Sequence, residues 1–284
     1  MKKKTSIRFY NNKPIRSRFD EELNEWLVCA VDLVEATIIT NNPRIYWYTV
    51  KRRNIELQKE CKQIKMTARD DKVYNTDCLT NKGVELFLLI VPLKSRVNLK
   101  EWLNGDDNSL DNKSKLKAYE LYENGLINII EVGTIKGLIQ IHSYIFGGLY
   151  DFAGKIRNKN ISKGGFAFAD YRFLENTLEN IEKMAEDSFD KIIDKYIEMN
   201  IAHPFMEGNG RSTRIWLDLI LKKNLSLCVD WRKIEKEDYL NAMKESVYSS
   251  EKISNLIKKA LTNDIDNREL FMIGIDYSYY YEEV

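Results

Sequence analysis

Residues 203–214 read His203-Pro204-Phe205-Met206-Glu207-Gly208-Asn209-Gly210-Arg211-Ser212-Thr213-Arg214. Pro204 stops the helix that precedes it, because proline lacks the amide N–H and its ring clashes with the previous turn. Gly208-Asn209-Gly210 can adopt left-handed backbone angles and expose successive N–H groups, which form a nest for an anion. A helix predicted over residues 212–223 adds the positive end of its dipole. The stretch therefore predicts a phosphate-binding loop between two helices.

The side chains of this stretch fit the same chemistry. Arg211 and Arg214 lie three residues apart, on one helix face, and both can form forked hydrogen bonds to phosphate. Glu207 stands beside the nest and suits Mg²⁺, and His203 can take up a proton near neutral pH. A core histidine in a helix-loop-helix turn is the alternative interpretation. A base, a carboxylate, a glycine nest and two arginines within twelve residues favour the phosphate site.

The stretch resembles the signature of Fic-domain proteins, H-x-F-x-[D/E]-G-N-G-R-x-x-R, at every defined position. The resemblance extends from about Lys115 to the C-terminus and includes the run Gly147-Gly148-Leu149-Tyr150-Asp151-Phe152-Ala153-Gly154. It implies a mainly α Fic fold with a β-hairpin flap. It also implies a reaction that moves AMP from ATP to a hydroxyl of a target protein.

The resemblance assigns a role to each residue of the loop. His203 is the base that takes the proton of the target hydroxyl, and Glu207 holds Mg²⁺. The phosphates of the nucleotide are held by Gly208, Asn209, Gly210, Arg211 and Arg214. Relatives with lysine in the place of Gly210 phosphorylate their targets, so the glycine here implies AMP transfer. The base of the nucleotide stays open, and transfer of a different nucleotide is an alternative.

Helical periodicity dominates the rest of this part of the chain. We expect further helices over residues 114–124, 132–146, 171–186, 189–201, 236–245, 250–261 and 268–281. Residues 161–169 break the pattern with a Gly-Gly turn and alternating apolar residues, which predicts a β-hairpin. The resemblance implies that this hairpin is the flap, which docks a target segment by β-augmentation. Its docking residues are Ser162, Lys163, Gly164, Gly165 and Phe166.

The last residues read Asp276-Tyr277-Ser278-Tyr279-Tyr280-Tyr281-Glu282-Glu283-Val284, and Ser278 and Glu282 share one helix face. An amphipathic helix that packs its tyrosines on the body is one interpretation. The pattern also resembles S-x-x-x-E, the inhibitory motif of the Fic class that carries it at the C-terminus. That resemblance implies that Glu282 pairs with Arg214 and blocks the seat of the γ-phosphate. It also implies self-modification at Tyr279 and Tyr280.

The first part of the chain has a different composition. Residues 1–104 carry 20 Lys or Arg and 13 Asp or Glu, against 24 and 30 in the remainder. Short β-rich runs at residues 7–10, 26–30 and 86–91 mix with helical segments, which predicts a smaller α+β domain. The polar, acidic stretch 105–113 predicts a linker. We therefore expect one domain over residues 1–104 and a second over residues 114–284.

An apolar strand at residues 26–30 leads into an amphipathic helix, and a turn with Pro43 leads to a helix rich in Tyr, Trp, Lys and Arg. Basic residues beside aromatics suit a nucleic-acid backbone, and a solvated basic helix with core aromatics explains the spacing equally well. Residues 6–103 resemble the Bro-N domain of phage antirepressor-like proteins in Ile7-Arg8-Phe9-Tyr10 and Thr76-Asp77-Cys78. This resemblance implies DNA binding through Arg44, Lys51, Arg52 and Arg53.

Composition removes several classes of protein. No apolar run approaches the roughly 18 residues of a membrane span, and no apolar segment follows Lys2-Lys3-Lys4 as in a secretory signal. The four cysteines form no C-x-x-C pair, and the chain has two histidines. We therefore expect reduced thiols, no structural zinc site and a cytoplasmic location.

Two functions stay open at this point. The first is an autoinhibited adenylyltransferase that uses ATP and Mg²⁺ to modify a target protein and itself. Targets in related proteins include the ATPase subunits of type II topoisomerases, which implies a growth-inhibiting, toxin-like role. Related proteins form homo-oligomers, and we expect the same of this chain. The second is a DNA-binding, antirepressor-like regulator whose Fic domain only binds nucleotide. The intact His203 and Glu207 favour the first.

Overall fold

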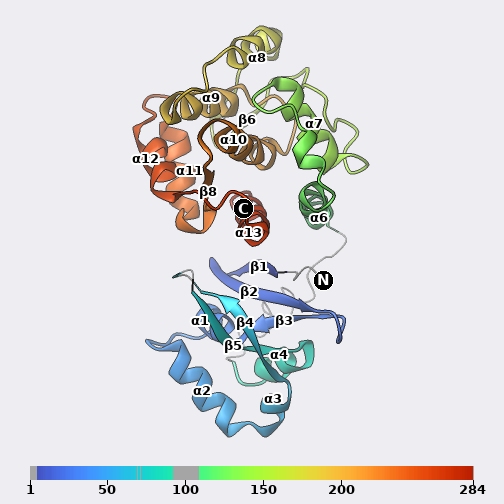
Figure 1. Cartoon of the computed structure of the whole chain (residues 1–284), viewed down its shortest axis with the longest axis vertical. Coiled ribbons are helices and arrows are strands. Elements are labelled where there is room, and N and C mark those ends of the chain that lie inside the picture. The colour runs from blue at the N-terminus through green and yellow to red at the C-terminus, as the bar shows by residue number, and fades with distance from the viewer. Residues whose placement is uncertain (1–4, 69, 71, 92–108, 284) are drawn as a thin grey trace. The chain divides into compact units, whose positions relative to one another are not determined.

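The computed structural model describes residues 5–68, 70, 72–91 and 109–283. The chain divides into two compact units, Met1–Asp107 and Asn108–Val284 (Figure 1). Residues 105–108 of the predicted linker lie outside the described residues. Within the described part of the chain, no helix combines the length and the apolarity that a membrane span needs.

The first unit is built on a five-stranded antiparallel sheet with the strand order β1-β2-β3-β5-β4. The strands are β1 Thr5–Tyr10, β2 Lys13–Asp20, β3 Glu25–Cys29, β4 Cys61–Thr67 and β5 Val73–Leu79. The helices are α1 Ala30–Thr37, α2 Pro43–Arg53, α3 Ile55–Lys59 and α4 Asn81–Leu88. Leu33, Trp47, Leu57 and Phe87 belong to one buried apolar cluster. This unit is the expected smaller α+β region.

The β-rich run predicted at residues 86–91 is wrong, because its first half belongs to helix α4. Thr80 caps this helix, since its Oγ1 accepts a hydrogen bond from the N–H of Gly83 at 3.0 Å. Val84, Phe87 and Leu88 are buried, at the three- and four-residue spacing of a helix face. The unbroken apolar run of residues 86–91 concealed this helical period.

The second unit is mainly helical. Its elements before the candidate loop are α6 Leu110–Glu123, η1 Leu126–Ile129, α7 Ile135–Phe146, β6 Ser162–Lys163, β7 Phe166–Ala167, η2 Tyr171–Phe173, α8 Leu174–Glu182 and α9 Phe189–Ala202. Those after it are α10 Asn209–Leu225, β8 Cys228–Val229, η3 Trp231–Lys233, α11 Lys236–Glu245, α12 Glu251–Ala260, β9 Leu261–Thr262 and α13 Arg268–Tyr280. Helix α10 packs against α7, α9 and α13, and Figure 1 shows it surrounded by the other helices. The loop before α10 is therefore held from several sides.

The linker predicted over residues 105–113 extends too far, because helix α6 begins at Leu110. Ser109 caps the helix, since its Oγ accepts a hydrogen bond from the N–H of Asn112 at 3.1 Å. Asp111 lies in the first turn, where the helix dipole favours a negative charge. From Ser109 onward, the polar residues that suggested a linker are thus the N-terminal cap and first turn of a helix.

Candidate functional site

Residues 203–208 form the loop between α9 and α10. His203 ends α9 with left-handed angles, φ 49° and ψ 64°, and Gly208 precedes α10 with φ 78°. A Cβ on Gly208 would lie 2.3 Å from Phe146 Cε2, so both the angle and the space require glycine. Helix α10 begins at Asn209, not at Ser212 as predicted. The N–H groups that can meet an anion are therefore the first ones of α10, since the N–H of Gly208 donates to Glu207 Oε1 at 2.9 Å and Gly210 is already helical.

Asn209 uses its side chain to close the loop on itself. The N–H of Phe205 donates to Asn209 Oδ1 at 2.8 Å, and Asn209 Nδ2 donates to the carbonyl of Phe205 at 2.8 Å. Both polar atoms of the amide thus have main-chain partners in a buried environment. The part of Asn209 that can meet a phosphate is its main-chain N–H at the start of α10.

His142, which sequence reasoning did not select, supports the loop from α7. The N–H of Gly154 donates to His142 Nδ1 at 2.8 Å, so the ring proton is on Nε2, which donates to the carbonyl of Glu207 at 2.9 Å. The ring stacks on Phe205 with 3.8 Å between centroids. Burial lowers the pKa of His142 to about 4, so the ring is neutral at pH 7.

His203 is arranged as a proton acceptor. Its Nδ1 lies 3.2 Å from the carbonyl of Asn200, which can only accept, so the proton is on Nδ1 and Nε2 has a lone pair. The ring stacks on Phe168 with 3.7 Å between centroids and 12° between planes. Burial lowers the pKa of His203 to about 4. The imidazole is therefore neutral at pH 7, as a general base must be.

Arg211 is the buried cation of the first helical turn. Its Nη2 donates to Glu207 Oε1 at 2.9 Å, and its Nη1 donates to Asp111, a residue of α6 that sequence reasoning assigned to the linker. The guanidinium carbon lies 5.1 Å from the ring of Phe146 and 5.2 Å from that of Tyr279. Its Nε is buried and has no hydrogen-bond partner among the described residues. The Nε donor of Arg211 is thus not used by the described residues.

Arg214 is engaged by the last helix. Its Nε donates to Ser278 Oγ, and its Nη2 donates to the carbonyl of Ser278 and to Glu282 Oε1, all at 2.7 Å. Tyr239 and Tyr281 cover the guanidinium at 5.5 and 5.4 Å from its carbon. The structure therefore brings Ser278 and Glu282 to Arg214, at the positions that the S-x-x-x-E spacing implies.

The predicted hairpin forms, with Ser162 opposite Ala167 and Lys163 opposite Phe166. Gly164 and Gly165 have φ values of 57° and 81°, which a two-residue type I′ turn requires at both central positions. Lys163 Nζ lies 3.2 Å from Glu282 Oε2. The carboxylate of Glu282 therefore contacts the hairpin as well as Arg214.

Tyr279 and Tyr280, expected as self-modification residues, are both buried. The hydroxyl of Tyr279 donates to Ser114 Oγ at 2.9 Å, and Lys236 Nζ lies 4.7 Å from the ring centre of Tyr280. Modification of Tyr279 therefore requires that α13 move away from α6.

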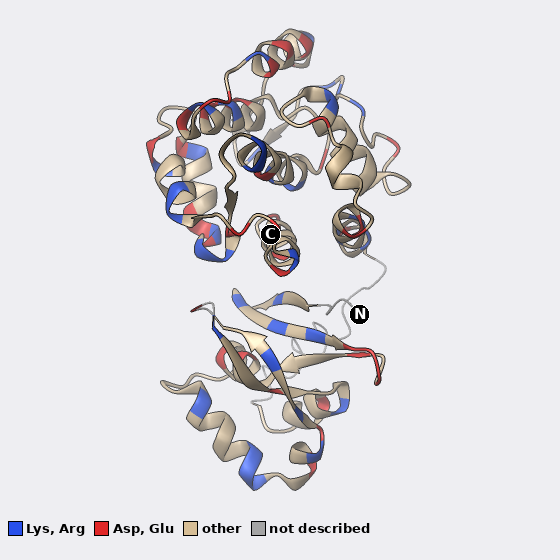
Figure 2. Ribbon diagram, viewed as in Figure 1, with Lys and Arg blue, Asp and Glu red and all other residues tan. Residues whose placement is uncertain are grey.

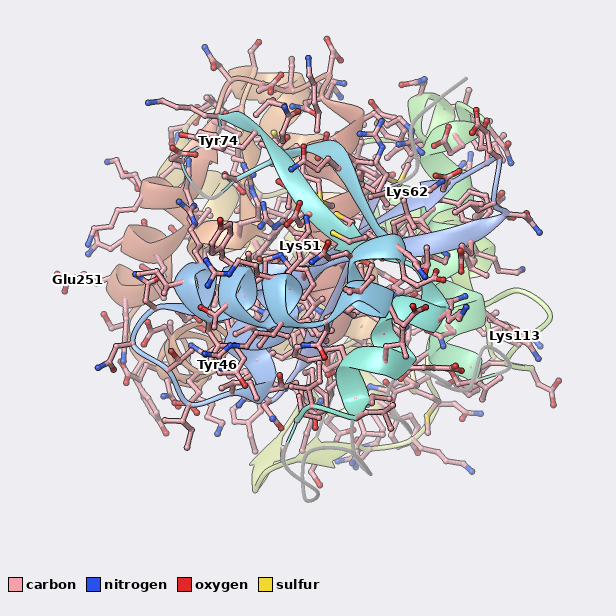
Figure 3. The ribbon with its side chains drawn as sticks, turned by 90° about the horizontal axis from the view of Figure 1, so that it is seen from below. Tyr46, Lys51, Lys62, Tyr74, Lys113 and Glu251 are labelled. Carbon is pink, nitrogen blue, oxygen red and sulfur yellow. The ribbon has the colours of Figure 1, made fainter. Side chains whose placement is uncertain are left out.

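The four basic residues predicted to contact DNA have different surroundings. Arg44, Arg52 and Arg53 of α2 are exposed, and Figure 2 shows basic residues at both ends of this helix. Lys51, labelled in Figure 3, forms an ion pair with Asp77 of β5 at 2.9 Å. The indole N–H of Trp47 donates to the same carboxylate at 2.8 Å. Lys51 is thus committed within the unit, and three arginines stay available.

Residues 133–221 match the Fic/DOC family. The match lies within the second unit and includes the loop between α9 and α10. The chain is similar to the protein adenylyltransferase VbhT of Bartonella schoenbuchensis, with 30% identity over 169 residues that cover 55% of this chain and 34% of that protein. It is also similar to the probable protein adenylyltransferase Fic of Escherichia coli, with 27% identity over 130 residues, 40% of this chain and 64% of that protein.

Among solved structures, the BepC protein of Bartonella tribocorum with bound AMPPNP is similar at 18% identity and a TM-score of 0.45, over 55% of this chain and 88% of that one. The match to the Bartonella adenylyltransferase spans about a third of that protein, and the match to the E. coli protein spans just under two thirds of it. The part of the chain that matches the Fic/DOC family is thus similar to proteins that are named as adenylyltransferases. In this part, His203, Glu207, Arg211 and Arg214 lie on one loop and the helix that follows it.

Proposed function

We propose that the Fic domain is a protein adenylyltransferase that moves AMP from ATP to a hydroxyl of a target protein and of the chain itself. The observation that carries the proposal is the neutral His203 imidazole, with its Nε2 lone pair, beside the N-terminus of α10. The target hydroxyl gives its proton to His203 Nε2 while its oxygen forms a bond to the α-phosphorus. The bond from that phosphorus to the α,β-bridging oxygen breaks, and pyrophosphate leaves.

The negative charge of the phosphates is met by the donors at the start of α10. The first helical N–H groups and the partnerless Nε of Arg211 supply hydrogen bonds, and the helix dipole adds to them. Arg214 supplies a second guanidinium once α13 releases it. These groups position the α-phosphorus for attack and stabilise the charge that develops on its oxygens.

Glu207 fits the requirements of a magnesium ligand. Its side chain is 54% exposed beside the anion nest, and Arg211 and the N–H of Gly208 orient its Oε1. Mg²⁺ commonly binds through one or two carboxylates together with substrate phosphates. In the described part of the chain, no cluster of three or more metal-ligating side chains competes for this role. When bound here, Mg²⁺ would neutralise phosphate charge.

We further propose that α13 inhibits the reaction. Glu282 occupies the guanidinium of Arg214 and excludes the terminal phosphate of ATP from it. For the target we take, from the resemblance, an ATPase subunit of a type II topoisomerase, docked by the hairpin edge at Lys163–Phe166.

The test is transfer of label from [α-³²P]ATP with Mg²⁺ in a bacterial lysate. The native chain, Glu282→Gly, and Glu282→Gly with His203→Ala are compared. Label on the chain and on one lysate protein with Glu282→Gly alone supports both the transferase and its inhibition. No label in any variant, with nucleotide binding intact, favours the nucleotide-binding regulator.

The first unit supports a second candidate function, DNA binding. Arg44, Tyr48 and Arg52 lie four residues apart on α2, and all three are exposed. An aromatic residue between two cations on one face suits a phosphate backbone. Binding of the full chain to duplex DNA that weakens with salt and with Arg44→Gln/Arg52→Gln, but not with Lys59→Gln, supports it.

A further inference from the structure

Arg157 is a buried cation in the segment between α7 and the hairpin. Its guanidinium donates four hydrogen bonds, all to main-chain carbonyls. Nε donates to His203 at 2.8 Å, Nη2 to Ala202 at 3.0 Å and also to Ala169, and Nη1 to Lys159 at 2.6 Å. The side chain thus donates its hydrogen bonds to main-chain carbonyls rather than to a carboxylate.

These four carbonyls belong to two different segments of the chain. Ala202 and His203 are the end of α9, where carbonyls lack helical partners and a cation is favoured. Lys159 and Ala169 lie on either side of the hairpin. The main-chain N–H of Arg157 adds a bond to the carbonyl of Pro204 at 2.8 Å. Because a guanidinium holds its donors in a rigid plane, Arg157 fixes the hairpin stem to the loop.

The backbone that Arg157 holds is strained. His203 has φ 49°, a conformation that is unfavourable for a residue with a Cβ and persists only when its surroundings enforce it. Arg157 Nε binds the carbonyl of this same residue. On the hairpin side, Phe168 stacks on the His203 ring. One buried side chain therefore joins the base to the element that docks the target.

We infer that Arg157 is a positioning residue, which sets the His203 imidazole and the hairpin at the separation that the transfer needs. The inference rests on the proposed function, in which His203 is the base and the hairpin docks the target. Arg157 touches neither substrate and acts through the His203 main chain and the hairpin stem.

The charge of Arg157 gives a second readout. After burial, the groups that set the pKa of His203 are the carbonyl of Asn200 and the charges of Glu282, Lys163 and Arg157. Arg157 lowers that pKa, because a nearby positive charge disfavours the imidazolium. Loss of the guanidinium therefore raises the pKa of His203.

The experiment compares two substitutions. Arg157→Met removes the guanidinium, and Arg157→Lys keeps the positive charge but not the planar set of N–H donors. Both are made in the Glu282→Gly chain. Lys155→Met is the matched control, because it removes an exposed cation two residues away, at a residue that accepts none of the four bonds. We expect Arg157→Met to lower kcat about 100-fold with the KM for ATP unchanged, as for a misplaced base. Arg157→Lys should retain part of the rate of the Glu282→Gly parent, and Lys155→Met should retain all of it.

NMR titration of the imidazole protons measures the pKa of His203 without depending on AMP transfer. The chain has two histidines, so His203→Ala assigns both signals. We expect Arg157→Met to raise the pKa of His203 and to shift its ring protons as the Phe168 stack loosens. Unchanged His203 signals in that variant would overturn the inference, as would a parallel loss of kcat, ATP affinity and melting temperature. A Glu282→Gly parent that transfers no label would refute the proposed function, and the NMR arm would still decide the role of Arg157.

Discussion

Arg214 Nη2 donates a hydrogen bond to Glu282 Oε1 at 2.7 Å, which joins the second turn of α10 to the residues that follow α13. Ser278 accepts two more bonds from the same guanidinium, through its Oγ and its carbonyl. Arg214 is almost fully buried, and removal of one partner of such a pair costs about 3–5 kcal/mol. In the proposed mechanism, Arg214 therefore binds a phosphate only after it gives up its hydrogen bonds to Ser278 and Glu282.

Lys163 should strengthen the proposed inhibited state, because its ammonium lies 3.2 Å from the second oxygen of Glu282. Lys163 is largely exposed, and an exposed pair contributes about 0.2–1 kcal/mol, so Lys163→Met should raise basal self-labelling about 1.4- to 5-fold. Lys163→Arg keeps the charge, so its basal self-labelling should equal that of the native chain. In the Glu282→Gly chain, Lys163→Met should bring no further increase. A fall in labelling there would assign the lysine to target docking alone.

Gly210 should be required for the docking of Glu282. A Cβ at this position would lie 2.2 Å from Glu282 Oε1 and 3.1 Å from Arg214 Nη1, so the carboxylate would have to move. We expect Gly210→Ala to lower the melting temperature of the native chain and to have little effect once Glu282→Gly is present. Thermal unfolding of the four chains of this double-mutant cycle measures the coupling. A coupling near zero would mean that Gly210 and Glu282 do not share this space.

The ion pair of Arg214 and Glu282 should weaken in acid. Burial raises the pKa of Glu282, but Arg214 and Lys163 lower it more, and the result is about 2 against an ordinary 4.5. A carboxylate with a depressed pKa contributes stability that is complete above its unfolded pKa and is lost as the pH falls through the folded one, at most about 3 kcal/mol here. The difference in unfolding free energy between the native chain and Glu282→Gln should therefore shrink from pH 5 toward pH 2.

The neighbouring Glu283 provides the control for this slope, because burial raises its pKa. A carboxyl with a raised pKa contributes stability at low pH and loses it as the pH rises. Glu283→Gln should therefore show a pH dependence of the opposite sign. A Glu282→Gln difference that stays constant from pH 7 to pH 3 would exclude ionisation of Glu282 as the source.

The sequence was sufficient for parts of the site that are local. The His203–Arg214 stretch contains the loop, Gly208 and both arginines within twelve residues. The Gly164-Gly165 turn, likewise local, specifies the hairpin. The Ser278 and Glu282 spacing predicted one shared helix face, but α13 ends at Tyr280 and Glu282 lies in the turn after it. Both residues still meet Arg214, the partner that the resemblance supplied. Helix starts were less certain: left-handed Gly208 lets α10 begin at Asn209, and the Ser109 cap starts α6 inside the expected linker.

Residues that act through contacts distant in the sequence escaped prediction. Asp111 reaches Arg211 across 100 positions and His142 reaches the Glu207 carbonyl across 65. Arg157 binds carbonyls, which no side-chain motif reveals. Lys51 was expected to contact DNA, but it forms an ion pair with Asp77. Asp77 lies on β5, 26 positions further along the chain, so the sequence around Lys51 does not show this partner. These contacts depend on tertiary packing, so residue type and spacing alone do not specify them.

Asn209 should act on nucleotide binding by shaping the loop rather than by touching phosphate with its amide. Asn209→Ala leaves the buried N–H and carbonyl of Phe205 without their partners, at about 1–3 kcal/mol for each group. We expect a lower melting temperature and weaker binding of a fluorescent ATP analogue in the Glu282→Gly chain. Asn224→Ala removes two amide hydrogen bonds at the far end of the same helix and should leave ATP binding unchanged. If Asn209→Ala binds the analogue as tightly as its parent, the loop keeps its shape without this amide, and His142 becomes the residue that holds it.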